Sequence, residues 1–246
     1  MASIKVGDVF TNNQGCRAIV LAYNNKNDVL IEFLDHYIYR RSVFACALRN
    51  GGFKNLLYPS VVGVGCIGVG EYAAKINGVM TRAYHAWRNM LTRCYDERLR
   101  SRFPTYADCT VCESWLNYQN FAKWFNENNY NIDDYEVDKD LIKNGNKVYC
   151  PQFCALVPRD LNMLLTKPKI TSKKLPVGVS RNGKSFRSRY SGLDNITIFI
   201  GNFKTAQEAH QEYVIAKEAY VKEVVNKWRG RIDERVYDAL MNWTAS

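Results

Sequence analysis

The first part of the chain alternates short apolar runs with polar turns. Residues 6–10, 17–21 and 29–33 are rich in Val, Ile, Leu and Phe, and the segments between them are rich in Asn, Gln, Asp and Gly. Short apolar runs bounded by turn residues are typical of β-strands. Several strands at this spacing predict a small SH3-like barrel or a curled sheet within residues 1–70. Glycines between 63 and 70 predict a flexible hinge after it.

The middle of the chain changes to helical spacing. A helix is expected over residues 81–95, because apolar side chains recur there at intervals of three or four residues. A second helix is expected near 116–126 on similar grounds. The predicted buried residues are Tyr84, Trp87, Leu91 and Cys94 in the first helix, and Leu116, Phe121, Trp124 and Phe125 in the second.

Residues 135–165 predict a strand, a turn, a second strand and a helix in close succession. The β-like run 135–137 is followed by a polar turn at 143–146, where Asn and Gly tolerate the positive φ of a tight turn. A second apolar run covers 154–157. Pro158 stands where a helix could begin, since proline needs no amide partner in a first helical turn.

Short strands return after a basic linker at residues 167–175. Asn182-Gly183 between two of these strands is a strong hairpin signal. Thr205 stands three residues before Glu208, which is the spacing of a capping box and predicts the start of a helix. The three predicted strands cover residues 177–181, 185–190 and 196–201.

The charge of the chain favours a polyanionic partner. It has 34 Lys and Arg against 24 Asp and Glu, a formal net charge of +10, for which a nucleic acid is the simplest polyanionic partner. Arginines are frequent over 82–102, and guanidinium groups pair bidentately with phosphate oxygens. A solvated surface is the alternative explanation. The candidate DNA-binding residues are Arg88, Arg93, Lys167, Lys169, Lys173, Lys174, Arg181, Lys184, Arg187 and Arg189.

Composition narrows the class of protein further. Hydrophobic residues make up 47% of the chain, enough for folded cores and too many for a disordered chain. No run approaches the ~20 apolar residues of a membrane-spanning helix, and the first residues lack a secretory apolar segment. We therefore expect a cytoplasmic protein with no membrane contact, in which the eight cysteines are reduced or bound to metal.

Four cysteines have ligand-like spacing. Cys109 and Cys112 form one pair, and Cys150 and Cys154 form another. Together they could bind one tetrahedral Zn²⁺, with Cys94 as a possible substitute for one of them. The other interpretation is that these residues are buried free cysteines that act as small hydrophobic side chains.

Two groups of residues carry a resemblance to a known family. In the segment 135–165 they are Val137-Asp138-Lys139-Asp140, Gly145-Asn146, Tyr149-x-Pro151, Cys154-x-Leu156-Val157-Pro158 and Asn162. Upstream they are Trp87-x-x-Met90-x-x-Arg93-Cys94-Tyr95, Val111-Cys112-x-x-Trp115 and Phe121. These residues resemble the ββα-metal finger, and the helices before it, of phage-encoded HNH homing endonucleases.

The resemblance implies metal-dependent cleavage of DNA. In such fingers an acidic residue and a helix Asn or His hold one divalent cation, Mg²⁺ or Mn²⁺, which stabilises the transition state and the leaving oxygen. Asp138 and Asn162 would be the ligands, with Asp140 a third candidate. The position of the usual His base holds Lys139, a poor base unless burial lowers its pKa, so His85 is the alternative base. The competing interpretation is a solvated turn in a structural hairpin.

A second resemblance concerns the C-terminal part. The residues that carry it are Gly178-Val179, Ile200-Gly201-x-Phe203-x-Thr205 and Glu208-Ala209-x-x-x-Tyr213. They resemble the AP2 DNA-binding domain, whose three-stranded sheet enters the major groove. Arg187 and Arg189 are expected to share one face of a strand, and Arg181 and Lys184 to lie close across the hairpin.

These observations predict an α+β protein with four parts. They are a β-barrel-like module at 1–70, a degenerate HNH finger with preceding helices at 78–166, the linker at 167–175, and an AP2-like domain at 176–246. The predicted function is a metal-dependent DNA endonuclease of homing type that binds a long duplex site and nicks or cuts it. One alternative is a catalytically inactive DNA-binding protein derived from a nuclease. Another is a phage protein whose N-terminal module docks on a host machine.

Overall fold

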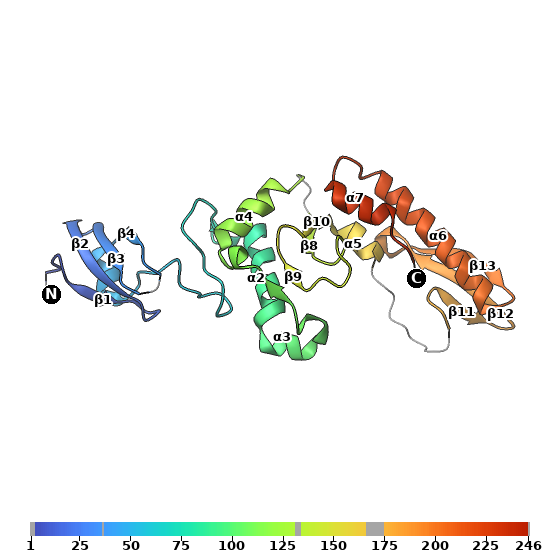
Figure 1. The fold of residues 1–246 in the computed structure, drawn as a ribbon, viewed down its shortest axis with the longest axis horizontal. Coiled ribbons are helices and arrows are strands. Elements are labelled where there is room, and N and C mark those ends of the chain that lie inside the picture. The colour runs from blue at the N-terminus through green and yellow to red at the C-terminus, as the bar shows by residue number, and fades with distance from the viewer. Residues whose placement is uncertain (1–2, 36, 131–133, 166–174, 246) are drawn as a thin grey trace. The chain divides into compact units, whose positions relative to one another are not determined.

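The chain folds into two compact units that each combine helices with small sheets. The structure, a computed structural model, describes residues 3–35, 37–130, 134–165 and 175–245. The units are Met1–Lys123 and Trp124–Ser246 (Figure 1). The predicted α+β class is confirmed.

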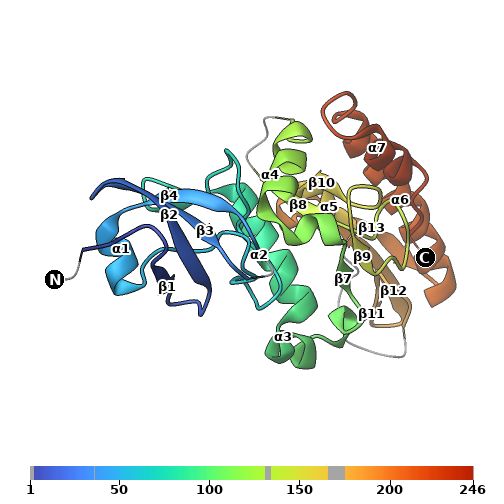
Figure 2. The ribbon, with the colours of Figure 1, turned by 60° about the vertical axis from the view of Figure 1, so that its left-hand side comes forward.

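The first unit begins with a four-stranded antiparallel sheet in the sequential order β1-β2-β3-β4. Alternate residues of β3 are fully buried, and Ile31 and Phe33 are among them. A short helix, α1, lies beside the sheet and adds Leu48 to its core (Figure 2). The elements are β1 (Val9–Thr11), β2 (Arg17–Asn25), β3 (Asp28–Phe33), β4 (Arg40–Val43) and α1 (Ala45–Asn50).

The predicted barrel is wrong, because this sheet is open. In the described residues β1 pairs only with β2, and β4 only with β3. Four strands, the first only three residues long, are too few to close round a packed interior, for which small barrels commonly use about eight. The curled sheet, the other form considered from the sequence, is the closer description.

The two helices predicted for the middle of the chain are present as α2 and α4, and α4 extends across the boundary between the units. The helix α2 begins after Thr81, whose side chain accepts a hydrogen bond from the Tyr84 N–H group, and it buries Trp87, Leu91 and Cys94 as expected. The Trp87 indole N–H donates to the Trp115 carbonyl oxygen at 2.6 Å. The remaining elements are β5 (Lys75–Ile76), β6 (Val79–Met80), α2 (Arg82–Tyr95), α3 (Glu97–Arg102), η1 (Pro104–Tyr106), β7 (Thr110–Val111), η2 (Glu113–Leu116) and α4 (Tyr118–Glu127).

The glycine-rich segment at 63–70 does not form the predicted hinge. A Cβ atom on Gly65 would lie 2.4 Å from the Leu91 side chain and 2.8 Å from Trp87, so the backbone packs directly on α2. The backbone of Cys66 is also hydrogen-bonded on both sides, to Leu116 and Tyr118. The glycines in this segment let the backbone pack closely against neighbouring side chains.

After the last turn of α4, the second unit contains the predicted strand, turn, strand and helix. The strands β8 and β10 pair antiparallel, with Asp138 opposite Ala155 and Tyr135 opposite Pro158. Pro158 thus ends the strand and the helix begins one residue later. The elements are β8 (Tyr135–Asp138), β9 (Val148–Tyr149), β10 (Ala155–Pro158) and α5 (Arg159–Leu165). We call residues 135–165 the finger.

The rest of the second unit is a three-stranded antiparallel sheet in the order β11-β12-β13, with α6 along one face (Figure 1). The capping box of Thr205 and Glu208 is present at the start of α6, as predicted. The short helix α7 was not predicted. The elements are β11 (Val179–Asn182), β12 (Ser185–Ser191), η3 (Leu193–Asn195), β13 (Thr197–Phe203), α6 (Ala206–Asn226) and α7 (Glu234–Met241).

The finger and the C-terminal helices share one hydrophobic core. Val157 of β10 and Leu161 of α5 pack in the same cluster as Val225 of α6 and Leu240 of α7. The C-terminal sheet is therefore joined to the finger through α6 and not by the chain alone. None of the described helices is long and apolar enough to cross a bilayer.

Candidate functional sites

Asp138 lies at the end of β8, on the face of the hairpin that α5 covers. Its partner in the register, Ala155, belongs to the core that contains Leu161 of α5. Because side chains alternate along a strand, Glu136 lies on the same face. Polar groups of β8 and α5 are thus brought to one side of the finger.

The Asp138 carboxylate organises the turn that follows it. Its Oδ1 atom accepts hydrogen bonds from the N–H groups of Asp140 at 2.8 Å and Leu141 at 2.7 Å. Burial raises the pKa of Asp138, and these two hydrogen bonds offset the effect only in part. Within the described residues, Asp138 makes hydrogen bonds through Oδ1 alone, which leaves Oδ2 for a ligand.

Asn162 on α5 contacts a residue that the sequence reasoning missed. Its Nδ2 group donates to the Glu136 Oε2 atom at 2.5 Å. Glu136 precedes Asp138 by two residues, so the strand period could have found it. Glu136 is thus held by Asn162 of α5, and Asp138 lies two residues further on the same face of β8.

Lys139 and Asp140 form an ion pair with each other. The Lys139 ammonium lies 2.7 Å from both oxygens of Asp140 and 2.9 Å from the Asn146 carbonyl oxygen. The Lys139 side chain is only 8% exposed, whereas that of Asp140 is 54% exposed. An ammonium that donates to three oxygen atoms has no lone pair for proton abstraction. This geometry favours a structural role for Lys139. It also means that both carboxylate oxygens of Asp140 already accept hydrogen bonds.

The residues between β8 and α5 fit a hard divalent cation. Carboxylate and amide oxygens are the ligand types that Mg²⁺ and Mn²⁺ prefer, and Mg²⁺ commonly uses one or two carboxylates with water and phosphate oxygens. A cation would also relieve the burial of the Asp138 anion. Within the described part of the chain, no group of three or more His, Cys, Asp or Glu is arranged as metal ligands. Asp138, Glu136 and Asn162 are the residues that would hold the ion.

An arginine from α7 holds the turn before β10. Arg235 donates to the carbonyl oxygens of Gln152 at 3.0 Å, and of Pro151 and Cys154 at 3.5 Å. It also forms an ion pair with Asp233, with Nη2 and Oδ2 2.6 Å apart. Burial acts against the Asp233 anion, but the hydrogen bonds from Arg235 outweigh it and lower the pKa of Asp233. The sequence offered no sign of this contact.

Three of the predicted site residues lie in the first unit, on α2. His85 is exposed, and its Nδ1 atom lies 3.3 Å from the Asn89 amide nitrogen. Arg88 is exposed as well, whereas Arg93 is half-buried with its guanidinium 5.7 Å from the Tyr106 ring centre. Their roles in DNA binding and proton transfer remain predictions.

The two cysteine pairs belong to different units. Cys109 is buried and Cys112 half-buried in the first unit, and Cys150 and Cys154 are buried in the second. No disulfide bond joins any of these four cysteines. The Zn²⁺ site that would join them stays a hypothesis beside the packing interpretation.

The C-terminal sheet presents an open face opposite α6. Ser188, on the other face of β12, is fully buried, and the Tyr190 ring on that same face lies 5.3 Å from the Tyr220 ring of α6. Arg187 and Arg189 therefore point away from the helix. They line a shallow hollow of about 350 Å³ together with Thr197 and Phe199. We call the surface formed by these four residues the sheet hollow.

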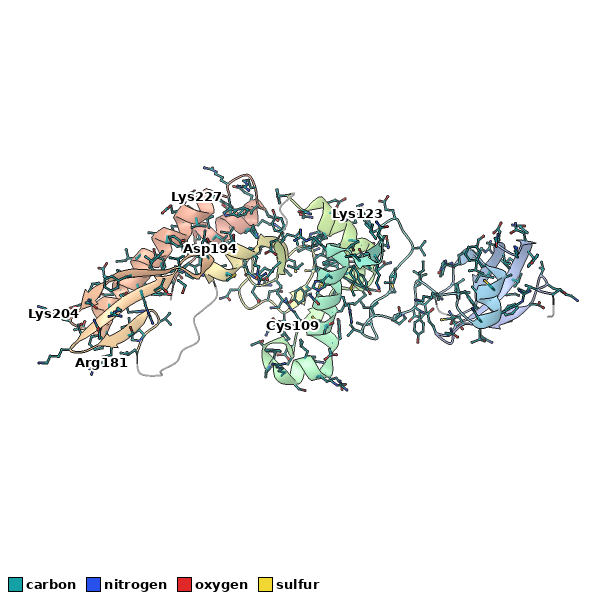
Figure 3. All side chains as sticks on the ribbon, turned by 180° about the vertical axis from the view of Figure 1, so that it is seen from behind. Cys109, Lys123, Arg181, Asp194, Lys204 and Lys227 are labelled. Atoms are coloured by element: carbon teal, nitrogen blue, oxygen red, sulfur yellow. The ribbon has the colours of Figure 1, made fainter. Side chains whose placement is uncertain are left out.

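The sheet hollow carries two positively charged side chains that have no acidic partner among the described residues. Neither the Arg187 nor the Arg189 side chain forms a hydrogen bond or an ion pair with any described residue. The three strands contain no Asp or Glu. Arg181 stacks over Phe186 at 5.4 Å, and Figure 3 shows Arg181 and Lys204 at the same end of the sheet. Lys184 is exposed in the β11–β12 turn.

The predicted linker residues Lys167, Lys169, Lys173 and Lys174 lie outside the described residues. Comparisons with known protein families, with curated proteins and with solved structures gave no match for this chain. The HNH and AP2 resemblances therefore rest on the quoted residues alone.

Proposed function

We propose that this protein binds duplex DNA through the open face of its C-terminal sheet. The observation that carries the proposal is the pair of unpaired arginines, Arg187 and Arg189, on strands that contain no acidic residue. Guanidinium groups without a protein partner are suited to phosphate oxygens and to guanine edges. The net charge of +10 supports the same partner.

The shape of the sheet also agrees with a DNA groove. Strands lie about 4.8 Å apart, so three strands span roughly 10 Å. The major groove of B-DNA is about 12 Å wide. The opposite side of the domain carries Glu208, Glu212 and Glu223, which are exposed on α6. Repulsion between these carboxylates and phosphate would orient the sheet, and not the helix, towards the duplex.

The test measures binding of labelled duplex DNA by fluorescence anisotropy. We expect the double change Arg187→Ala and Arg189→Ala to weaken binding by at least about tenfold, since each good base contact contributes about 1–3 kcal/mol. Arg229→Ala is the matched control, because Arg229 is exposed in the same unit but lies over Tyr237. Equal affinity of the double variant and the control would refute the proposal.

The finger supports a second candidate function, metal-dependent cleavage of the bound DNA. The observation that favours it is the gathering of Asp138, Glu136 and Asn162 between β8 and α5, with Asp138 Oδ2 uncommitted. When bound, Mg²⁺ or Mn²⁺ would stabilise charge on the scissile phosphate and the leaving oxygen. Asp138 and its neighbours would hold and orient the ion. This candidate agrees with the HNH resemblance.

Cleavage also needs a general base, and Lys139 does not supply one. Lys139 donates to three oxygens, so another group, such as His85, would have to accept the proton from water. Nicking of supercoiled plasmid in Mg²⁺ or Mn²⁺ tests the candidate, with Asp138→Ala expected to abolish nicking and keep binding. His85→Ala would then test the base. A wild-type protein that binds DNA and never nicks it would be the catalytically inactive DNA-binding protein.

A further inference from the structure

An exposed aromatic ring stands among the arginines of the sheet hollow. Phe199 is 57% exposed in the middle of β13, directly opposite Arg189 in the register. The other phenylalanines of the sheet, Phe186 and Phe203, pair with each other and are half-buried. A single exposed apolar side chain is common on protein surfaces, but Phe199 lies directly opposite an arginine on a face without acidic residues. This pairing suits a partner that offers both a hydrogen-bond acceptor and an apolar group.

We propose that the sheet hollow reads a guanine next to a thymine, with Arg189 on the guanine edge and Phe199 on the thymine methyl group. The proposal rests on the proposed DNA binding and specifies what is read. In the major groove, guanine presents two acceptors that a guanidinium can bridge, and thymine alone presents a methyl group. The two side chains thus match the two base edges in chemistry.

The spacing of the two residues fits neighbouring bases. Directly opposite residues of an antiparallel pair have Cβ atoms about 4.5–5.5 Å apart. Successive bases on one DNA strand are about 3.4 Å apart. A cross-strand pair can therefore address two adjacent bases without distortion of the duplex. Arg187, two residues along β12, extends the contact to phosphate or to a further base.

The experiment first selects preferred duplexes from a random 30-base-pair library with the full-length protein. Each thymine of a selected duplex is then replaced by uracil, which lacks only the methyl group, and each guanine by 7-deazaguanine, which lacks one acceptor. We expect one uracil to weaken binding about fourfold, the factor for one buried methyl-sized group. One 7-deazaguanine next to it should weaken binding about tenfold, as for one charged hydrogen bond.

The decisive comparison couples protein and DNA changes. In Phe199→Ala the uracil substitution should have no effect, whereas in Ile215→Ala it should keep its full effect. Ile215 is the matched control because it is 62% exposed on α6, away from the sheet. Both side chains are on the surface, so both variants should fold, which circular dichroism checks.

The outcomes separate this proposal from the one it rests on. If no duplex is enriched or bound, DNA binding itself is wrong. If duplexes bind but uracil costs nothing, or costs the same in Phe199→Ala, only the readout is wrong. A rise in 2-aminopurine fluorescence at the contacted step without a uracil effect would also overturn it, because Phe199 would then be a wedge between bases.

Discussion

Lys139 fixes the turn of the finger through its ammonium group. Its three hydrogen bonds tie Asp140 to the Asn146 backbone, and Asn146 donates back to the Lys139 carbonyl oxygen at 2.9 Å. We expect Lys139→Met to lower the free energy of unfolding by about 1–3 kcal/mol, because the Asn146 carbonyl loses its donor in a buried place. Urea denaturation of the full chain measures this change.

Lys143→Met is the control for that change. Lys143 is exposed, and its ammonium group lies 4.7 Å from the centre of the Phe153 ring. We expect a change within about 0.5 kcal/mol. If Lys139→Met were equally mild, the hydrogen bonds of Lys139 would not hold the turn.

Asp138 should make stability depend on pH. Burial raises its pKa in the folded protein, so the folded state holds the proton more tightly than the unfolded chain does. Its contribution to stability is therefore fully present below the unfolded pKa and is lost as pH rises from there through the folded pKa. We expect Asp138→Asn, which keeps an acceptor for the turn, to raise Tm at pH 7 and to change it less at pH 4.

The melting temperatures of the two proteins at these pH values check the sign. A lower Tm for Asp138→Asn at pH 7 would show that the hydrogen bonds to the anion outweigh its burial. Added Mg²⁺ gives a second measurement, since an ion at Asp138 should raise the Tm of the wild type and not of the variant.

At the scale of elements, the helices α5, α6 and α7 act as one packed body. Leu161 of α5 is 1% exposed in the core that also contains Val225 of α6. We expect Leu161→Ala to cost about 2–5 kcal/mol, the usual range for a buried leucine. Because the core is common, hydrogen exchange should rise together in the finger and in the C-terminal sheet. Protection lost from residues 134–165 alone would contradict this.

Met163→Ala on the same helix is the control. Met163 is 46% exposed, so its truncation should leave no cavity. Both variants keep the helical propensity of α5, since alanine is a good helix former. The difference between them isolates the shared core.

Local patterns predicted the elements better than their associations. Trp87 and Leu91 fixed the face of α2 by spacing, and Thr205 with Glu208 marked the start of α6. The contact of Arg235 with three backbone carbonyls has no pattern, because any residue supplies a carbonyl. The burial of Lys217 on α6 was not predicted either; its ammonium group donates to the Ser191 carbonyl oxygen at 2.8 Å.

The candidate site was predictable to a similar degree. The HNH resemblance singled out Asp138, which ends β8 in the structure, and period two placed Arg187 and Arg189 together. The contact between Asn162 and Glu136 could not be predicted, because the packing of α5 on β8 decides which strand residue Asn162 meets. The exposure of Phe199 could not be predicted either, since a strand pattern does not say which face of the sheet a helix will cover.

For the whole molecule, salt dependence is the measure of DNA contact. If about six cations engage phosphates, the logarithm of the binding constant should fall with the logarithm of salt concentration at a slope near −5. Anisotropy titrations between about 50 and 200 mM salt give the slope. A slope near zero would mean that the charge of +10 serves something other than DNA.

The common core of α5, α6 and α7 also limits how the protein can evolve by recombination. Genes that gain new targets often do so by exchanging a recognition segment between coding sequences. Here a crossover in the linker at 167–175 would bring a foreign α6 against Val157 and Leu161, and the buried faces would have to fit each other anew. Successful recombinants should therefore exchange the finger and the sheet together, and new specificity should arise more readily by substitutions on the open strands.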